Sequence, residues 1–120
     1  MMKYTDSHEW IRKEETLATV GISRHARQEL GEIVYVELPK VGQEVHAGAE
    51  IAVLESTKAA ADIYAPVSGK VTKVNTALTE NIALINDEPE GNGWLFEIEM
   101  HDATELDTLL DKAAYQSLIS

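Results

Sequence analysis

Turn-forming residues recur every few positions through the middle of this chain. Gly42, Gly48, Pro66 and Gly69 divide it into short apolar runs. Such close spacing favours short strands joined by tight turns over strand–helix–strand units. The sequence therefore predicts an antiparallel sandwich or a small barrel.

One lysine stands out within this pattern. Two apolar runs in residues 53–66 flank a short polar and small-residue segment, which predicts a β-hairpin with Lys58 at or beside its tip. We expect a fully solvated side chain, held away from the body of the domain. Lysine amines are mostly charged at neutral pH, but they are good acyl acceptors once deprotonated. Lys58 could be an ordinary turn lysine, yet Glu55 precedes it and the small residues 59–61 follow it, so the tip could enter another protein's active site.

Further elements can be read from the pattern of apolar residues. Ser23 can begin a short helix near 23–30 and Gly31 can end it. Thr104 with Asp107 gives a helix-start signal before a leucine stripe, which predicts a C-terminal helix near 105–118. Strands are expected over Glu9–Arg12, Leu17–Ile22, Ile33–Leu38 as a well-buried strand, and Trp94–Met100 with alternating burial.

A faint internal repeat is also visible. Gly48–Glu55 resembles Thr79–Asn86 in its pattern of apolar residues. Two like halves related by a pseudo-two-fold axis would place Lys58 after one copy and an acidic loop after the other.

Composition limits the classes of function. The 120 residues suit one compact domain spanning 1–120, and the formal net charge of −11 disfavours nucleic acid and anionic membranes as partners. This charge instead favours basic surfaces on partner proteins. The chain has no cysteine, no apolar run of membrane-spanning length and no signal-peptide or transit-peptide character at its start, so we expect a cytoplasmic protein.

The usual signals of catalysis are missing. The four histidines, at positions 8, 25, 46 and 101, are far apart and none has a partner at metal-ligand spacing. No serine lies in a nucleophile-elbow sequence. We therefore expect neither a catalytic residue nor a metal site, and the sequence favours a carrier over an enzyme.

Several segments, in order, resemble the H-protein family of the glycine cleavage system: Ser7–Trp10, Leu30–Pro39, Glu55–Pro66, Gly93–Phe96 and a Leu-rich ending. The resemblance covers essentially the whole chain. It implies a mainly β fold, a barrel-sandwich hybrid of two antiparallel sheets like that of lipoyl domains. It also implies a carrier that takes an aminomethyl group from glycine decarboxylase to a tetrahydrofolate-dependent aminomethyltransferase, and electrons to dihydrolipoamide dehydrogenase.

The resemblance assigns roles to particular residues. Lipoate would be joined to Lys58 by a lipoate-attaching enzyme, with Glu55 serving in recognition. The loaded arm would fold back onto Glu9, with Ser7 and Asp62 as possible neighbours. A carboxylate there would hold the cationic amine. By sequence position alone Glu9 would be a surface strand residue, and the protein is expected to be a monomer.

Three alternatives remain open. Biotin carrier domains have a similar hairpin but usually flank the lysine with methionines, whereas Thr57 and Ala59 stand here. Lipoyl domains of 2-oxo acid dehydrogenase acyltransferases are shorter and are followed by flexible linkers. An H-like protein that only donates lipoate to other proteins would carry the same modified lysine, so the sequence does not separate it from a working carrier.

Overall fold

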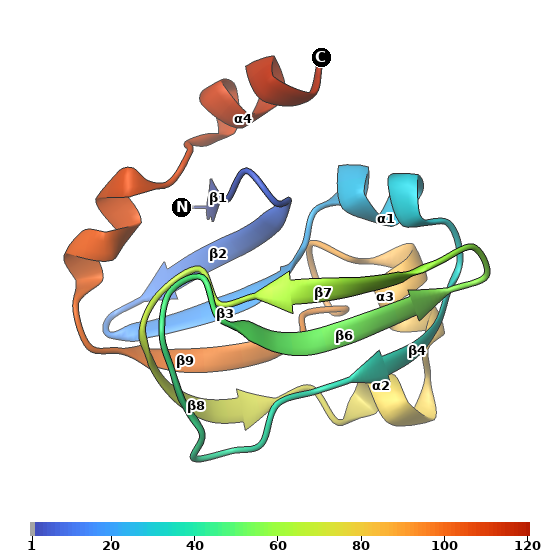
Figure 1. Ribbon diagram of the computed structural model, residues 1–120, viewed down its shortest axis with the longest axis horizontal. Helices are drawn as coiled ribbons and strands as arrows, with labels where there is room; N and C mark the ends of the chain where they lie inside the picture. Colours follow the sequence, from blue (N-terminus) through green and yellow to red (C-terminus); the bar gives the residue numbers. More distant parts are fainter. Residues whose placement is uncertain (1) are drawn as a thin grey trace.

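The computed structural model describes residues 2–120, and its strands form two antiparallel sheets (Figure 1). The larger sheet has the order β1-β2-β3-β9-β8-β5 and the smaller one the order β4-β6-β7. Strands of the larger sheet are β1 (Met2–Tyr4), β2 (Glu9–Glu14), β3 (Leu17–Ile22), β5 (Glu44–Val45), β8 (Gly69–Val74) and β9 (Phe96–Met100). The smaller sheet contains β4 (Ile33–Glu37), β6 (Glu50–Ser56) and β7 (Ala60–Tyr64). The predicted mainly β fold of two antiparallel sheets is confirmed.

One apolar core joins the two sheets. Val20 and Ile98 of the larger sheet are fully buried, as are Leu54 and Ile33 of the smaller one. In β9 the buried Phe96, Ile98 and Met100 alternate with the more exposed Glu97 and Glu99, as the period-2 pattern predicted. Burial of side chains from both sheets is what fixes the sheets relative to each other.

The prediction of a well-buried strand over 33–38 is wrong in part. Val34 and Tyr35 of β4 are 51% and 52% exposed. A register irregularity between Ile33 and Tyr35 interrupts the pairing of β4 with β6. Because a bulge adds a residue to one strand, two neighbouring side chains turn outward where a regular strand would send one inward.

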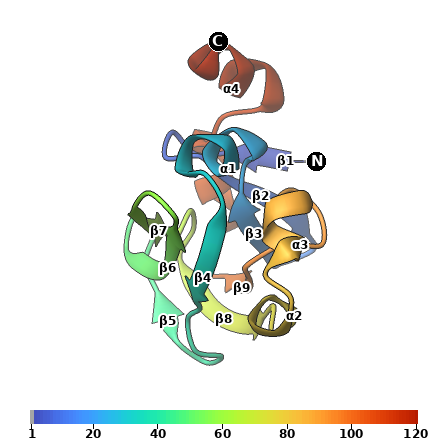
Figure 2. The ribbon, with the colours of Figure 1, turned by 90° about the vertical axis from the view of Figure 1, so that its right-hand side faces the viewer.

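The predicted internal repeat is also wrong. Residues 79–86 do not repeat the strand β6 but run from the end of one short helix, α2 (Ala77–Glu80), into a second, α3 (Ala83–Asp87). Leu78 and Ile85 are buried and Ile82 packs against the core. Their spacing of four and three residues is a helical period, and this period outweighed the apparent likeness to β6. Figure 2 shows both helices beside the ends of the sheets.

Helix α1 (Arg24–Leu30) follows the prediction. The Ser23 hydroxyl accepts a hydrogen bond from the Ala26 N–H at 3.1 Å and so caps the first turn. Gly31 ends the helix with φ +88°, a backbone conformation that glycine adopts most easily.

The C-terminal segment differs from the single helix predicted over 105–118. It forms a 3-10 helix, η1 (Ala103–Thr108), and after a break the helix α4 (Lys112–Ile119). At the break, Leu110 forms an isolated bridge with Tyr4 through two backbone hydrogen bonds of 2.8 Å. This tertiary pairing requires an extended backbone, so the helix restarts only at Asp111, whose carboxylate caps α4. Within residues 2–120, no helix has the length and apolar character needed to cross a membrane.

Candidate functional site

The β6–β7 hairpin presents Lys58 at its tip. The hydroxyl of Ser56 accepts hydrogen bonds from the backbone N–H groups of Lys58 and Ala59, at 3.1 and 3.0 Å. It also donates to the Ala59 carbonyl at 3.1 Å. Three short contacts from one serine hold the turn in a single conformation. Sequence reasoning did not select Ser56, although a serine two residues before a turn lysine is a recognisable turn signal.

The side chain of Lys58 is exposed, but it is not held away from the body of the protein as expected. Its Nζ donates a hydrogen bond to the carbonyl of Glu29, in the last turn of α1, at 3.2 Å. A cation is favoured there because the final carbonyls of a helix carry partial negative charge. A Cβ atom at Gly31 would lie 2.8 Å from Lys58 Cε. The lysine therefore rests in a position that depends on the absence of a side chain at Gly31.

A further backbone contact ties the tip to the α1–β4 connection. The Thr57 N–H donates to the Glu32 carbonyl at 3.1 Å. Figure 1 shows the hairpin tip beside this connection at the right-hand edge of the molecule. Glu55 lies on β6 with an exposed side chain, opposite Ala60 on one side and Tyr35 on the other.

Glu9 is buried, in contrast to the surface residue expected from its position in a strand. Its side chain is 1% exposed. The carboxylate accepts hydrogen bonds from the hydroxyls of Thr5 and Ser7 at 2.5 and 2.6 Å, and from the backbone N–H of Tyr64 at 3.3 Å. The pKa of Glu9 is raised by burial, and these hydrogen bonds oppose that rise.

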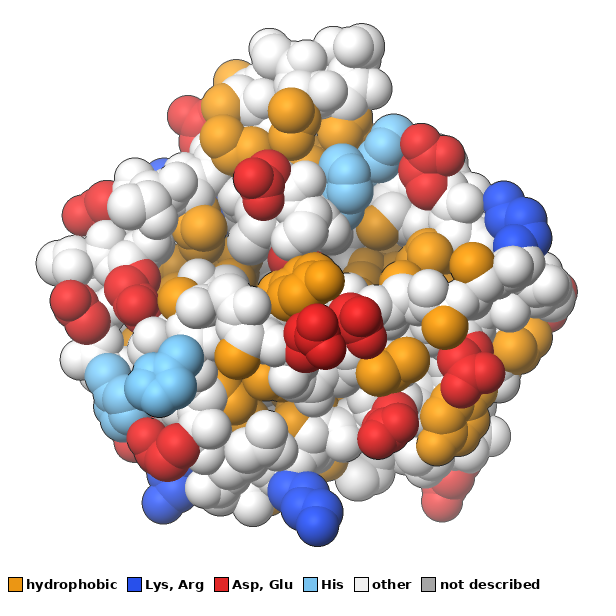
Figure 3. Space-filling model, in the orientation of Figure 1, with side chains coloured by type: hydrophobic (Ala, Val, Ile, Leu, Met, Phe, Trp, Pro, Cys, Tyr) orange, Lys and Arg blue, Asp and Glu red, His pale blue; other side chains and the backbone are white. Residues whose placement is uncertain are grey.

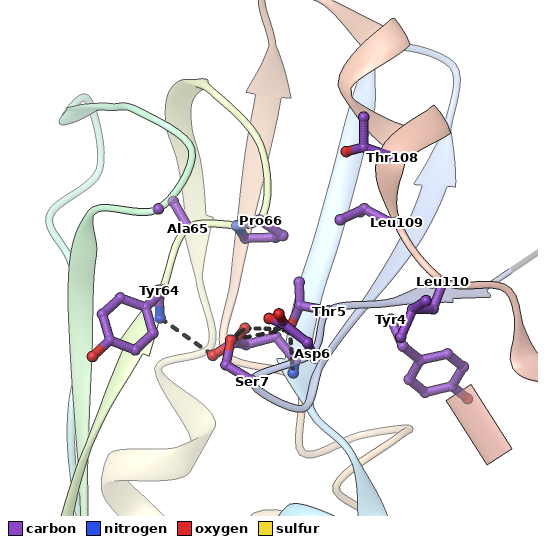
Figure 4. Close-up of a pocket in the computed structure, with 12 residues that line it drawn as sticks. Tyr4, Thr5, Asp6, Ser7, Tyr64, Ala65, Pro66, Thr108, Leu109 and Leu110 are labelled. Carbon is purple, nitrogen blue, oxygen red and sulfur yellow. Dashed lines mark hydrogen bonds between the residues drawn. The ribbon is translucent and has the colours of Figure 1, made fainter. Parts of the chain in front are cut away.

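An open hollow of about 500 Å³ has Glu9 in its lining (Figure 4). Three segments form its walls: the loop before β2, the end of β7 and the extended stretch between η1 and α4. The lining residues include Ser7 and Glu9 together with Tyr4, Thr5, Asp6, Gly48, Tyr64, Ala65, Pro66, Thr108, Leu109 and Leu110. The structure thus brings two of the three predicted arm-docking residues together.

Asp62 is placed elsewhere. It is exposed on β7 and lines a different hollow, shared with Glu37, Pro39 and Glu50. Lys58 and the Glu9 hollow lie at opposite ends of β7, because Ala60 follows the tip and Tyr64 borders the hollow.

Sequence reasoning missed a polar network beside the Glu9 hollow. His8 has φ +75°, and its Nδ1 lies 2.8 Å from the hydroxyl of Tyr115, a hydrogen bond that joins α4 to the loop before β2. The Tyr115 hydroxyl also shares a hydrogen bond of 2.6 Å with Ser23. His8 and His25, distant in sequence, lie with ring centroids 5.0 Å apart. No group of three or more possible metal ligands was found among residues 2–120.

Known proteins resemble this chain over nearly its full length. The family model described as "Glycine cleavage H-protein" matches residues 2–120. The chain belongs to the glycine cleavage H-protein family. The glycine cleavage system H protein of Thermotoga maritima is 55% identical over 97% of this chain and 94% of its own. That of Shewanella loihica is 56% identical over 98% of this chain and 92% of its own.

A solved structure agrees with the fold as well. The crystal structure of a glycine cleavage system H protein from Mycobacterium marinum has a TM-score of 0.87 and 37% identity, over 97% of this chain and 94% of that one. Members of this family are non-catalytic lipoyl carriers of the glycine cleavage system, and this chain has that role. It works with the other components of the system.

Proposed function

We propose that Lys58 is the residue to which lipoate is joined through an amide. The main support for this proposal is the exposed side chain of Lys58 at a hairpin tip. Within residues 2–120, it is the only lysine at a hairpin tip bordered by small residues. Ala59 and Ala60 leave the amine accessible, and Gly31 leaves space along the lysine stem. These residues fit a long, uncharged arm on Lys58, since no bulky side chain blocks its path out of the turn.

When bound, lipoate supplies a dithiolane whose sulfurs carry the one-carbon amine fragment and the electrons. The protein supplies position and shelter. Ser56 fixes the turn so that Lys58 projects in one direction, which reduces the entropy lost when an enzyme takes hold of the tip. Glu55, exposed and three residues before the lysine, is proposed to be read by the lipoate-attaching enzyme.

The Glu9 hollow is proposed to receive a cationic amine. The Glu9 carboxylate would accept the amine's hydrogen bonds, and the neighbouring Ser7 hydroxyl would orient it. Charge-assisted hydrogen bonds of this kind are worth about 1.5–3 kcal/mol. Asp62, on the same strand as Tyr64, is proposed to act on the path between the tip and the hollow rather than inside it.

The partners proposed are glycine decarboxylase, the tetrahydrofolate-dependent aminomethyltransferase and dihydrolipoamide dehydrogenase. We propose that residues 1–120 act as one carrier domain and as a monomer in the cytoplasm. The strongly negative net charge supports partner surfaces that are basic around their active sites.

Two measurements test these assignments: the site of lipoate attachment, and turnover of the chain in reconstituted glycine cleavage. Peptide mapping of chain expressed with lipoate should place the added mass on Lys58 alone. Lys58→Arg should keep the melting temperature within a few degrees, because the lysine is exposed, yet should lose attachment and all carrier activity in reconstituted glycine cleavage. Lipoate on Lys40, Lys70 or Lys73 with a bare Lys58 would refute the assignment. If lipoylated chain were made but supported no turnover with active partner enzymes, the proposed carrier partners would be wrong.

A further inference from the structure

Two neighbouring apolar side chains on β4 face solvent. Val34 is 51% exposed and Tyr35 is 52% exposed, and only Val41 and Leu118 share this degree of exposure among the large hydrophobic residues described. The bulge between Ile33 and Tyr35 is what turns both outward. A bulge interrupts regular strand pairing, and this bulge also leaves two apolar side chains in solvent. Exposed apolar surface of this kind marks a site of interaction with another molecule.

This pair lies next to the hairpin tip. Tyr35 is directly opposite Glu55 on β6, and Ile33 is opposite Ser56, which organises the turn at Lys58. Opposed residues of an antiparallel pair share a face of the sheet, so the Tyr35 ring and the Glu55 carboxylate lie on the same face. β4 is also the outer strand of the smaller sheet. The Asn86 amide occupies the backbone N–H and C=O of Ile33, so the exposed side chains of Val34 and Tyr35, rather than the strand edge itself, are available to another protein.

The pair borders a shallow hollow of about 270 Å³ between β4 and α2. The side chains of Leu78 and Ile82 form an apolar wall of this hollow, and Glu80 adds a negatively charged side chain to its lining. We call the surface formed by Val34, Tyr35 and this hollow the β4 patch.

Acidic residues surround the β4 patch. Glu32 precedes β4 and Glu37 ends it, Glu55 faces Tyr35 and Glu80 lines the hollow, and all four side chains are exposed. The lining contains no lysine or arginine. Figure 3 shows apolar side chains bordered by acidic ones in the region of β4 and β6. A partner protein that complements the β4 patch would present an apolar protrusion surrounded by lysine and arginine side chains.

We propose that the β4 patch is the docking surface for the enzyme that attaches lipoate to Lys58. This inference rests on the proposed modification of Lys58. Attachment requires the enzyme to bring its reacting carbonyl carbon to Lys58 Nζ itself, so its surface must cover the residues beside the tip. Enzymes that act on the far end of a lipoyl arm can approach from further away.

The chemistry of attachment also accounts for the acidic rim. The deprotonated Nζ attacks the carbonyl carbon of an acyl-phosphate anhydride such as an acyl adenylate. The new amide N–C bond forms, the C–O bond to the phosphate breaks, the nucleotide leaves as its anion and the amine proton passes to solvent. An enzyme that binds this anionic donor needs cationic residues around its active site, and these match the glutamates of the β4 patch.

The test is the steady-state rate of lipoate attachment by a purified lipoate ligase with ATP and lipoate, at varied concentrations of unmodified chain. The variant V34T/Y35T keeps residues that favour a strand at both positions and removes the apolar surface. For this variant kcat/KM should fall about tenfold or more, because KM for the unmodified chain rises while kcat is unchanged. Aromatic side chains such as Tyr35 are typical hot spots of protein interfaces. Val41→Thr is the matched control, since Val41 is 62% exposed and lies outside the patch, and it should change kcat/KM by less than about twofold.

A charge variant keeps the proposal testable if the double variant does not fold. Glu80→Lys changes an exposed helix residue and should lower kcat/KM several-fold at low salt, with the loss shrinking as salt is added. Rates equal to those of Val41→Thr in both variants would overturn the docking proposal and leave lipoate on Lys58 intact. Normal attachment to the variants, followed by failure of the lipoylated chains in glycine cleavage, would assign the β4 patch to another enzyme and equally overturn it.

Discussion

Two substitutions of the buried Glu9 distinguish the effect of its charge from the effect of its hydrogen bonds. Glu9→Ala removes the acceptor for the hydroxyls of Thr5 and Ser7 and for the Tyr64 N–H. The two hydroxyls can rotate to new partners, since they already lie 3.2 Å apart, but the N–H cannot. The unpaired Tyr64 N–H and the cavity left by the shorter side chain should together lower the free energy of unfolding by about 2–4 kcal/mol. Alanine is therefore too disruptive to test docking of a ligand.

Glu9→Gln is the sharper variant. Its amide oxygen can still accept from Tyr64, while its NH₂ donates to the hydroxyls of Thr5 and Ser7. Burial raises the pKa of Glu9, so at a pH between the unfolded and the folded pKa the folded state still holds a proton that the unfolded state has released. Stability of the parent must therefore fall as pH rises from the unfolded pKa, near the ordinary glutamate value of 4.5, through the higher folded one. The glutamine variant carries no such proton and lacks this loss.

The assay is urea unfolding of parent and Glu9→Gln from about pH 4 to 8, a range that begins below the unfolded pKa of Glu9. A low protein concentration keeps the chain soluble near its pI of about 4.6. The stability of the variant relative to the parent should increase with pH and then level off above the folded pKa. Each tenfold shift in proton affinity is worth about 1.4 kcal/mol, which sets the scale of the effect. Parallel curves for the two proteins would refute the argument, because Glu9 would then ionise as easily in the folded as in the unfolded state.

Two further predictions concern the residues that hold Lys58 and α4. Gly31→Ala should move Lys58 off the Glu29 carbonyl and raise its reactivity toward an amine-specific reagent, whereas Gly48→Ala should not. Both glycines have φ +88°, so the two losses of stability should be similar, but only at Gly31 would the new Cβ meet Lys58, 2.8 Å from its flexible Cε. Unchanged reactivity of Lys58 in Gly31→Ala would show that the lysine does not rest there. Tyr115→Phe keeps the ring stacked on Tyr4 but removes the hydroxyl bonded to His8 and Ser23, at 2.8 and 2.6 Å, so the free energy of unfolding should fall by about 1–2 kcal/mol. A change below about 0.3 kcal/mol would mean that this hydroxyl does not secure α4.

Local patterns in the sequence were enough to predict the features that depend on neighbouring residues alone. The turn at Lys58 follows from polar and small residues between two apolar runs, and α1 follows from the Ser23 cap and Gly31. The alternation in β9 follows from the period of a half-buried strand. Each of these signals extends over fewer than fifteen residues, and in each case the tertiary contacts agree with the local preference.

Tertiary contacts decided the rest. Glu9 is buried because Tyr64, on a strand of the other sheet, donates to its carboxylate, and no local pattern reports that contact. The predicted C-terminal helix is broken because Leu110 pairs with Tyr4, more than a hundred residues earlier. Lys58 rests on α1 because its hairpin packs beside the α1–β4 connection. Contacts between segments far apart in sequence exist only once the chain has folded, since they stabilise a conformation that neither segment prefers alone.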